Sequence, residues 1–479
     1  MSDKLTPQAE LQAILEKQRN AFRREGEVKY ETRVDRLNRC IALLVDRKDE
    51  ICEAVDQDFG GRPRPVTLMT EIMTSVGTLK NSRKNLKKWM KPEKRKSPVP
   101  MNIFGAKSRV HYQPKGVVGI MTPWNVPIGM IFSPLADALA AGNRVMIKPS
   151  EFNPRTADLM KELFMEYFEP SEIYVATGDA DMGAAFSSQA LDHIIFTGAT
   201  SVGKLVMKAA AEHLTPVTLE LGGKSPVIVS DSYPIDEAAD SIISGKAMNG
   251  GQLCISPDYA FVPATRLEAF VMKCKQVMEE QHPCMVSCHD FVSIINERHY
   301  DRIKSYIDDA KKKGARILEI NPSKEDWSDR SKHRIPLHLI INPTEDMLCM
   351  QDEIFGPILN VMAYRDIQEC LDYINDRPHP LALYYYGKDK AEKNRVIAET
   401  TAGGMTVNDV TMHFACDDMP FGGVGASGMG HYHGFEGFKT FSHAKSVFTQ
   451  GKVNLPKLAG TLPPYGEKVE KMLLGQIKK

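Results

Sequence analysis

Apolar residues recur at helical spacing through the first part of the chain. In "AELQAILEKQRNAF", Leu11, Ile14, Leu15 and Phe22 are three, four or seven positions apart. This spacing places them on one face of a helix. Residues 34–55 continue the pattern, so helices are expected over the region before residue 100.

The pattern changes after residue 115, where short apolar runs are followed by turn-forming residues. These runs cover residues 116–123, 143–150, 172–179 and 193–200, and helical stretches separate them. Strands that alternate with helices are typical of a parallel, doubly wound sheet with helices on both faces. The sequence therefore predicts an α/β fold of the Rossmann type, in which ligands bind at the carboxyl ends of the strands.

A second α/β pattern runs from about residue 225 to 420. Residues 258–263 and 381–387 are expected to be strands, residues 266–281 and 298–314 helices, and a glycine-rich stretch, 420–434, closes the region. The alternating stretch at 108–116 suggests an edge strand or hairpin outside the main core. A chain of 479 residues is expected to form two or three domains.

Composition limits the classes of function. The 61 basic and 61 acidic residues cancel, so charge gives no reason to expect a nucleic acid partner. No stretch approaches ~18 consecutive apolar residues, so no membrane span is expected. Nine scattered cysteines and an N-terminus without the apolar core of a signal peptide favour a reducing, cytoplasmic location.

One cysteine has an unusual setting. Cys254 lies in "NGGQLCISPDY", after two glycines and a glutamine and before Ser-Pro-Asp, whereas most of the other cysteines lie in helical or apolar stretches. Glu220 ends an apolar strand in "LELGGKSP", where a carboxylate is either a solvated charge or a base in a cleft. Asn125 in "TPWN" follows the first predicted strand and reads, on its own, as a turn residue.

Several strand ends carry residues suited to a dinucleotide. In "FTGATSVGK", Gly198 and Gly203 open a helix whose N-terminus offers hydrogen-bond donors to phosphates, although a plain strand-to-helix turn explains the stretch equally well. Lys148 could donate to ribose hydroxyls. The charge of Glu151 would disfavour a 2′-phosphate, which favours NAD over NADP.

Taken together, these motifs resemble a known family. "TPWN", "KPSE", "FTGATSVG", "LELGGKSP", "GGQLC", "EIFGP" and "PFGGVGASG" occur in the order seen in the aldehyde dehydrogenase superfamily, over roughly residues 10 to 450. The "CISPDY" context and the ending "GMGHYHGFEGFKTFSHAKSV" look like the class 3 branch, and within it most like the coniferyl aldehyde dehydrogenases.

The resemblance implies roles for individual residues. Cys254 would be the nucleophile, the amide of Asn125 and the backbone N–H of Cys254 would hold the oxyanion, and Glu220 would be the general base. The cofactor, NAD with NADP as an alternative, would contact Thr122, Pro123, Trp124, Lys148, Glu151, Gly178, Gly198, Ala199, Val202, Gly203, Leu221, Glu353 and Phe355. Ala199 departs from the serine of many relatives, which removes one hydroxyl from the pyrophosphate site.

The resemblance also implies a substrate and an architecture. The substrate would be an aromatic aldehyde similar to coniferyl aldehyde, and the alternative substrate is a medium- or long-chain fatty aldehyde. The alternative functions are a CoA-acylating reaction and a non-catalytic protein. The expected division is a NAD-binding domain (1–105 and 118–222), a catalytic domain (223–429), bridging elements (106–117 and 430–460) and a tail (461–479). A homodimer is expected.

Two further segments remain open to interpretation. His282, Cys284, Cys288 and His289 are possible zinc ligands. However, a single short segment would have to supply all four, so no metal is expected. Thr411 to Cys416 are expected at the substrate entrance by analogy with the family.

Overall fold

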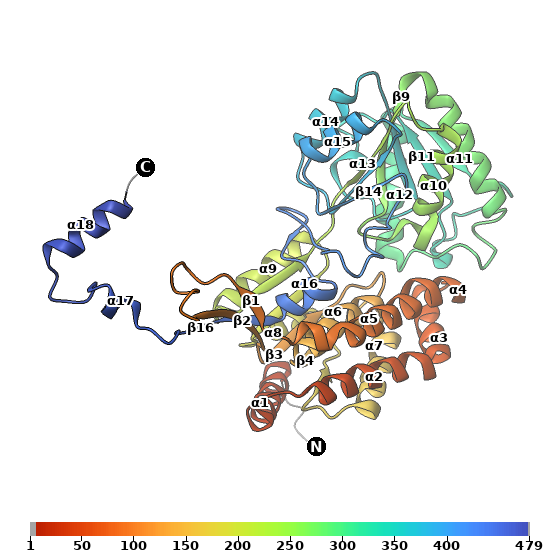
Figure 1. The fold of residues 1–479 in the computed structure, drawn as a ribbon. Helices are drawn as coiled ribbons and strands as arrows, with labels where there is room; N and C mark the ends of the chain where they lie inside the picture. Colours follow the sequence, from red (N-terminus) through yellow and green to blue (C-terminus); the bar gives the residue numbers. More distant parts are fainter. Residues whose placement is uncertain (1–5, 478–479) are drawn as a thin grey trace, which may run out of the picture.

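The computed structural model describes residues 6–477 and confirms the predicted α/β architecture. Figure 1 shows two main lobes, with the N-terminal helices and the first sheet in one and the second sheet in the other. Residues 1–5 lie outside the described residues, and they include the start of the N-terminal segment in which no signal peptide is expected. Residues 478–479 of the predicted tail also lie outside them.

The chain begins with helices whose apolar faces point inward. They are α1 (Pro7–Glu25), α2 (Tyr30–Asp46), α3 (Lys48–Phe59), α4 (Arg64–Thr67), the π-helical turn η1 (Leu68–Met73) and α5 (Thr74–Trp89). Leu11 and Leu15 of α1, and Leu37 and Leu44 of α2, are fully buried. The helical prediction for this region is confirmed.

The first large sheet, over the described residues, has the strand order β15-β7-β6-β3-β4-β5. Its strands are β3 (Val117–Met121), β4 (Arg144–Lys148), β5 (Ile173–Val175), β6 (His193–Thr197), β7 (Val217–Glu220) and β15 (Gly428–Met429). β3 to β7 run parallel, and β15 pairs with β7 antiparallel. The four apolar runs between residues 116 and 200 are therefore strands, as predicted.

Helices cover both faces of this sheet (Figure 1). They are α6 (Gly129–Ala141), α7 (Pro154–Tyr167), α8 (Ala180–Ser187) and α9 (Thr200–Ala211). Every residue of α6 is buried, because this apolar helix contacts β3 and β4 on one side and α2 and α5 on the other. The strand order reverses at β3, which lies between β4 and β6, and such a reversal is where α/β sheets bind ligands.

The second large sheet has the order β10-β11-β12-β9-β8-β13-β14 in the described chain. Its strands are β8 (Ser225–Val229), β9 (Pro257–Pro263), β10 (Arg316–Ile320), β11 (Leu337–Ile341), β12 (Ile358–Tyr364), β13 (Ala382–Tyr386) and β14 (Gly404–Val407). Its helices and 3₁₀ turns are α10 (Ile235–Ala247), η2 (Met248–Gly251), η3 (Ala264–Arg266), α11 (Leu267–Gln281), α12 (Glu297–Lys312), η4 (Arg330–Lys332), α13 (Leu348–Gln351), α14 (Ile367–Asn375) and α15 (Lys390–Glu399). The predicted strands and helices of this region are confirmed.

A small third sheet has the order β1-β2-β16. Its strands are β1 (Glu93–Arg95), β2 (Lys107–Pro114) and β16 (Ser442–Thr449), and α16 (Gly434–Thr440) precedes β16. The alternating stretch at 108–116 lies mostly in β2, outside the two large sheets as expected. It is the middle strand of its own sheet rather than an edge, because β1 and β16 pair with its two sides.

The described chain ends in two short helices, α17 (Leu455–Leu458) and α18 (Glu467–Gln476). In Figure 1 they extend away from both lobes, and none of their residues is buried. Within residues 6–477 every helix is too short or too polar to cross a membrane.

Candidate active site

The carboxyl ends of the first sheet's strands meet at one edge. Met121 at the end of β3 is level with Lys148 of β4 and with Phe196 of β6, and Thr197 is level with Glu220 of β7. The predicted residues follow these ends in turn: Thr122, Pro123, Trp124 and Asn125 after β3, Lys148 in β4, Gly178 after β5, Gly198 and Ala199 after β6, and Leu221 after β7. The parallel register therefore gathers residues that are far apart in the sequence.

Glu220 is a buried carboxyl group without a partner. Its exposed fraction is 2%, and neither carboxylate oxygen has a hydrogen-bond partner among the described residues. Burial raises the pKa of Glu220 well above its usual range, because an ion is costly to withdraw from water. Such a group is a candidate proton acceptor at a functional site rather than a solvated strand end.

Cys254 lies in the turn between η2 and β9, and it is half-buried. Gly250 and Gly251 shape this turn with φ values of +62° and +73°. Burial raises the pKa of the Cys254 thiol to about 12, and the charges of Glu353 and Glu220 contribute.

Asn125 connects the β3 loop to this turn. Its Nδ2 donates to the carbonyl oxygen of Gln252 at 2.9 Å, two residues before Cys254. Its own carbonyl oxygen accepts from Arg62 Nη1 and Asn249 Nδ2, both at 3.1 Å. The structure thus brings the Asn125 loop, the cysteine turn and Glu220 together.

The helix after β6 has the features of a phosphate-binding turn. Ala199 occupies the N-cap of α9 and offers no side-chain cap. Val202 in the first turn is 43% exposed. A Cβ at Gly203 would lie 2.7 Å from Leu221, and one at Gly198 would lie 2.6 Å from the Phe196 ring. Only glycine therefore fits at these two positions without displacing a neighbour.

Three other predicted cofactor residues line the same edge. The buried Thr122 has a hydroxyl group without a partner among the described residues. Lys148 Nζ donates to the carbonyl oxygen of Pro149 at 2.8 Å and to Glu151 Oε2 at 3.2 Å. Gly178 has a φ of +148°, and a Cβ there would lie 2.7 Å from Met182. These strand ends suit a dinucleotide. They offer a hydroxyl group without a partner, a helix N-terminus without a side-chain cap and a lysine, all of which can donate hydrogen bonds to phosphate or ribose oxygens.

An aromatic cluster joins this edge to the second lobe. The Trp124 ring lies 5.3 Å from the Phe355 ring and 4.9 Å from the imidazole of His299, centroid to centroid. Phe355 has a φ of +47°. Burial raises the pKa of the neighbouring Glu353 to about 8, and the charge of Asp258 contributes.

Sequence reasoning missed the residues that hold Glu353 in place. Asp258 Oδ2 accepts from the backbone N–H of Ile354 at 2.9 Å, and Asp258 Oδ1 pairs with Lys224 Nζ at 2.5 Å. Lys224 also donates to the carbonyl oxygen of Asp352 at 2.8 Å. Lys224 and Asp258 lie inside the motifs "LELGGKSP" and "CISPDY". Their position in these motifs was the only indication in the sequence that they belong to the site.

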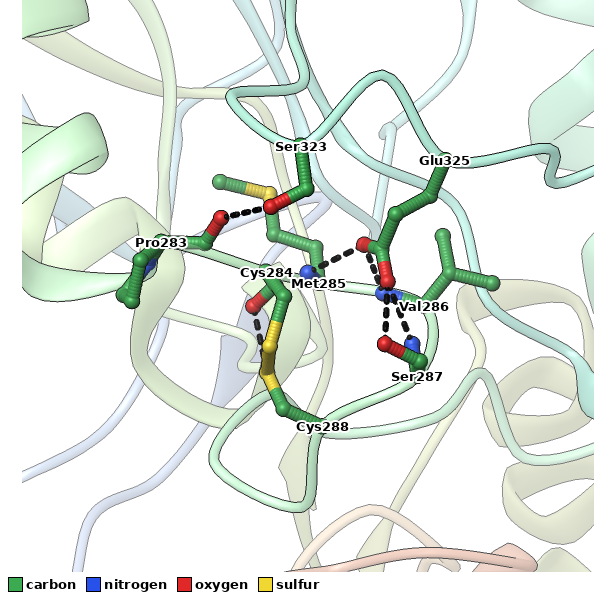
Figure 2. The surroundings of a disulfide bond; sticks show 8 residues. All are labelled: Pro283, Cys284, Met285, Val286, Ser287, Cys288, Ser323 and Glu325. Carbon is green, nitrogen blue, oxygen red and sulfur yellow. Dashed lines mark hydrogen bonds between the residues drawn. A yellow bond between two sulfur atoms is a disulfide. The ribbon is translucent and has the colours of Figure 1, made fainter.

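The Cys/His segment after α11 differs from expectation. Cys284 and Cys288 form a disulfide with a Cα–Cα distance of 5.8 Å (Figure 2), so two of the nine cysteines are paired rather than scattered thiols. The turn between the two cysteines brings their side chains together. A single Cys pair four residues apart is not the spacing of a disulfide framework, so the sequence did not indicate this bond. In the part of the chain from residue 6 to 477, no group of three or more His, Cys, Asp or Glu side chains is arranged to hold a metal ion.

Glu325 holds this disulfide loop. Its carboxylate accepts from the backbone N–H groups of Met285 and Val286, both at 2.7 Å, and of Ser287 at 2.8 Å. Figure 2 shows these bonds converging on the carboxylate. Burial alone would raise the pKa of Glu325, but the bonds from Ser287 and the backbone lower it to about 2.

A dinucleotide-type sheet whose strand ends lie beside a turn-borne thiol and a buried carboxyl group is typical of an α/β enzyme. Comparison with known proteins specifies the family. The family model described as "Aldehyde dehydrogenase family" matches residues 4–447. The chain therefore belongs to the aldehyde dehydrogenase family, whose members are oxidoreductases.

Individual relatives agree over nearly the full length. The chain is 51% identical over 467 residues to a "Probable coniferyl aldehyde dehydrogenase" of Caulobacter vibrioides, covering 97% of this chain and 96% of the relative. It is 46% identical over 464 residues to the "Coniferyl aldehyde dehydrogenase" of Pseudomonas sp. strain HR199, covering 97% and 95%.

Solved structures show the same fold. The substrate-bound state of Staphylococcus aureus AldH superposes with a TM-score of 0.90 at 34% identity, covering 98% of this chain and 99% of that one. A Mycobacterium tuberculosis aldehyde dehydrogenase complexed with NAD⁺ gives 0.83 at 26% identity, covering 93% and 91%.

Proposed function

We propose that this aldehyde dehydrogenase uses NAD to oxidise an aromatic aldehyde, similar to coniferyl aldehyde, to the carboxylic acid. The observation that carries the proposal is the grouping of Cys254, Glu220 and the Asn125 loop at the strand-end edge. The names of the relatives in Caulobacter and Pseudomonas support the choice of substrate.

Cys254 is the nucleophile of the proposed reaction. Its sulfur attacks the aldehyde carbon and forms a thiohemiacetal, whose oxygen carries negative charge as the C–S bond forms. The side-chain amide of Asn125 and the backbone N–H of Cys254 donate to that oxygen. Fixed donors of this kind stabilise the transition state, and loss of one costs about 10²–10³ in rate.

The cofactor binds at the strand-end edge in this proposal. Gly198, Gly203 and the N-terminus of α9 accommodate the pyrophosphate, Lys148 and Glu151 contact the adenosine ribose, and Glu353 contacts the other ribose. Trp124, Phe355, Val202 and Leu221 supply apolar contact. NAD⁺ held there would supply the hydride acceptor for oxidation of the thiohemiacetal, and Cys254 would then carry the acyl group as a thioester.

Glu220 is the general base that completes turnover. It removes a proton from water, the water attacks the thioester, and the carboxylic acid leaves as the thiol is restored. A base works best when its pKa lies near the working pH, and burial moves the pKa of Glu220 upward from its usual range. Because this base is present, we favour hydrolysis over transfer to CoA.

Aromatic residues in and beside the proposed entrance segment support an aromatic substrate. The Phe414 ring lies 4.9 Å from that of Phe421 and 5.1 Å from the imidazole of His433. Phe414 belongs to the segment from Thr411 to Cys416 that we assign to the substrate entrance. A medium- or long-chain fatty aldehyde is the second candidate, because an apolar entrance also suits an alkyl chain.

The test is NADH formation, followed by absorbance, with coniferyl aldehyde, benzaldehyde and decanal. We expect kcat/KM to be highest for coniferyl aldehyde and unchanged by added CoA. A preference for decanal would select the fatty aldehyde, and stimulation by CoA would select the acylating reaction. Absence of turnover with any aldehyde, from folded protein, would refute the proposed function.

We also propose the domain division and assembly implied by the family resemblance. Residues 1–105 and 118–222 form the NAD-binding domain, 223–429 the catalytic domain, 106–117 and 430–460 the bridging elements and 461–479 the tail. We propose a cytoplasmic homodimer, which light scattering and cell fractionation would test.

A further inference from the structure

Four distant segments are joined by a closed ring of hydrogen bonds. Arg62 Nη1 donates to the carbonyl oxygen of Asn125 at 3.1 Å, and Asn125 Nδ2 donates to that of Gln252 at 2.9 Å. Gln252 Nε2 donates to the carbonyl oxygen of Ser293, and the N–H of Ser293 donates to that of Gly61, both at 2.9 Å. Gly61 precedes Arg62 in the chain, so the ring closes.

The ring adjoins the proposed site but contains neither the Cys254 sulfur nor the Glu220 carboxylate. Asn125 is the proposed oxyanion donor, and Gln252 lies two residues before the proposed nucleophile. Side-chain nitrogens supply three of the four links and a backbone N–H supplies the fourth, and all four acceptors are backbone carbonyls. A shift at one corner is therefore transmitted to the next corner.

Arg62 is the charged corner of the ring. Its guanidinium pairs with Glu71, Nη1 to Oε1 at 2.7 Å, and both side chains are 0% exposed. The other carboxylate oxygen, Glu71 Oε2, accepts from the backbone N–H groups of Ile128 at 2.7 Å and Gly129 at 2.9 Å. The pair therefore holds the loop after β3 at Asn125 and again where α6 begins.

Stability alone is a weak reason for a buried pair of this kind. Replacing a buried ion pair by apolar residues is often neutral or stabilising, because both charges must leave water. The Arg62 guanidinium also donates through Nη2 to Thr70 Oγ1 at 3.0 Å. Such a planar fork fixes direction in a way that the single ammonium of lysine does not.

We propose that Arg62 is a positioning residue for the dehydrogenase reaction, and that it acts through Asn125. By holding the Asn125 carbonyl, Arg62 keeps the side-chain amide aimed at the place where the oxyanion forms. This inference rests on the proposed function, in which that amide is an oxyanion donor. A misplacement of about 1 Å in such a group can cost about 10²-fold in rate.

The experiment compares Arg62→Lys with wild-type enzyme and with Arg64→Met. Arg64 lies two residues away and forms an exposed pair with Asp49, so its loss leaves the ring intact. Active sites are counted by stoichiometric alkylation of Cys254, and kcat is expressed per active site. We expect Arg62→Lys to lower kcat about 10–100-fold, with the KM for NAD changed less than about threefold and Arg64→Met near wild type.

A double-mutant cycle separates positioning from general damage. If Arg62 acts through Asn125, then Arg62→Lys has no further effect once Asn125→Ala has removed the amide. We expect Asn125→Ala with Arg62→Lys to be within about twofold of Asn125→Ala alone. An equal fold loss in both backgrounds, or a kcat of Arg62→Lys within twofold of wild type, would overturn the proposal.

Two controls keep the result interpretable. Arg62→Met combined with Glu71→Leu removes both charges, so neither is left buried and unpaired, and it should show the same loss in kcat per active site. Full activity of this double variant would also overturn the proposal. Wild-type turnover of aldehyde, and its loss in Cys254→Ser, test the proposed function separately from the role of Arg62.

Discussion

Gly428 lies directly opposite Glu220 in the antiparallel pair that β15 forms with β7. Gly428 has a φ of +143°, and a Cβ at this position would collide with the carbonyl oxygen of Leu219. The close approach covers the end of β7 with backbone. It contributes to the burial of the Glu220 carboxyl group, which has no hydrogen-bond partner in the described chain.

Glu220→Gln should stabilise the protein, and more so at higher pH. The pKa of Glu220 is raised in the folded protein, so the folded state holds a proton that the unfolded state releases above its ordinary pKa. Wild-type stability therefore falls as pH rises between the unfolded and folded pKa values, and glutamine has no such penalty. The measurement is the melting temperature of both proteins at pH 5 and pH 8. A difference that is larger at pH 5 would contradict the assignment.

Cys254→Ser should lower aldehyde oxidation by at least about 10³-fold, because a serine hydroxyl lacks the nucleophilicity of a thiolate. NAD binding, measured by calorimetry, should change less than about twofold. Cys274→Ala, which removes a buried thiol from α11, is the matched control and should retain activity per folded molecule. Comparable losses in both variants would argue against Cys254 as the nucleophile.

Catalytic efficiency should rise with pH between about 6 and 9. Burial and the charges of Glu353 and Glu220 raise the pKa of Cys254 to about 12, and burial raises that of Glu220. Each group must lose its proton to act as nucleophile or base, so alkaline conditions increase the active fraction. The measurement is kcat/KM for aldehyde at saturating NAD. An efficiency that falls over this range would be inconsistent with both roles.

Glu151→Gln should improve the use of NADP. Glu151 pairs with Lys148 at the end of β4, and its charge would repel a 2′-phosphate on the adenosine ribose. Removing one like charge at about 4 Å in a solvated site is worth ~1 kcal/mol, which is about fivefold in kcat/KM. Glu162→Gln, an exposed change on α7, is the control. Equal NADP efficiency in all three proteins would place the ribose elsewhere.

The disulfide can be counted and its contribution measured. All nine cysteines lie within residues 6–477, and seven of them are free. Denatured protein should therefore titrate seven thiols without reductant and nine after reduction. Because the bridged residues are four apart, Cys284→Ser with Cys288→Ser should lower the free energy of unfolding by at most about 2 kcal/mol. Nine reactive thiols in unreduced protein would show that the pair is open.

Strands and helices with a characteristic pattern of neighbouring residues were predictable from the sequence. Apolar runs followed by turn residues located β3, β4, β5 and β6, because strands buried on both faces have no polar positions to interrupt them. The same kind of pattern placed Asn125, Lys148, Gly198 and Glu220 at or just after strand ends. These predictions needed only neighbouring residues.

Features that depend on distant partners were not predictable in the same way. β15 is two residues long and exists because β7 offers it an edge. The Arg62–Glu71 pair joins a loop to a π-helical turn. Its role depends on the hydrogen bonds that it makes with Asn125 and Ile128, which are distant in the sequence. Neither a two-residue strand nor a buried pair has a characteristic local pattern.

The pairing of Gly428 with Glu220 has a consequence for biosynthesis. A growing chain leaves the ribosome with its proposed base and nucleophile long before the segment that covers the end of β7 has been made. Before that segment docks, the carboxyl group at residue 220 lacks part of the cover that raises its pKa in the folded protein. The site therefore acquires its full burial only after residue 428 has been translated and β15 has paired with β7.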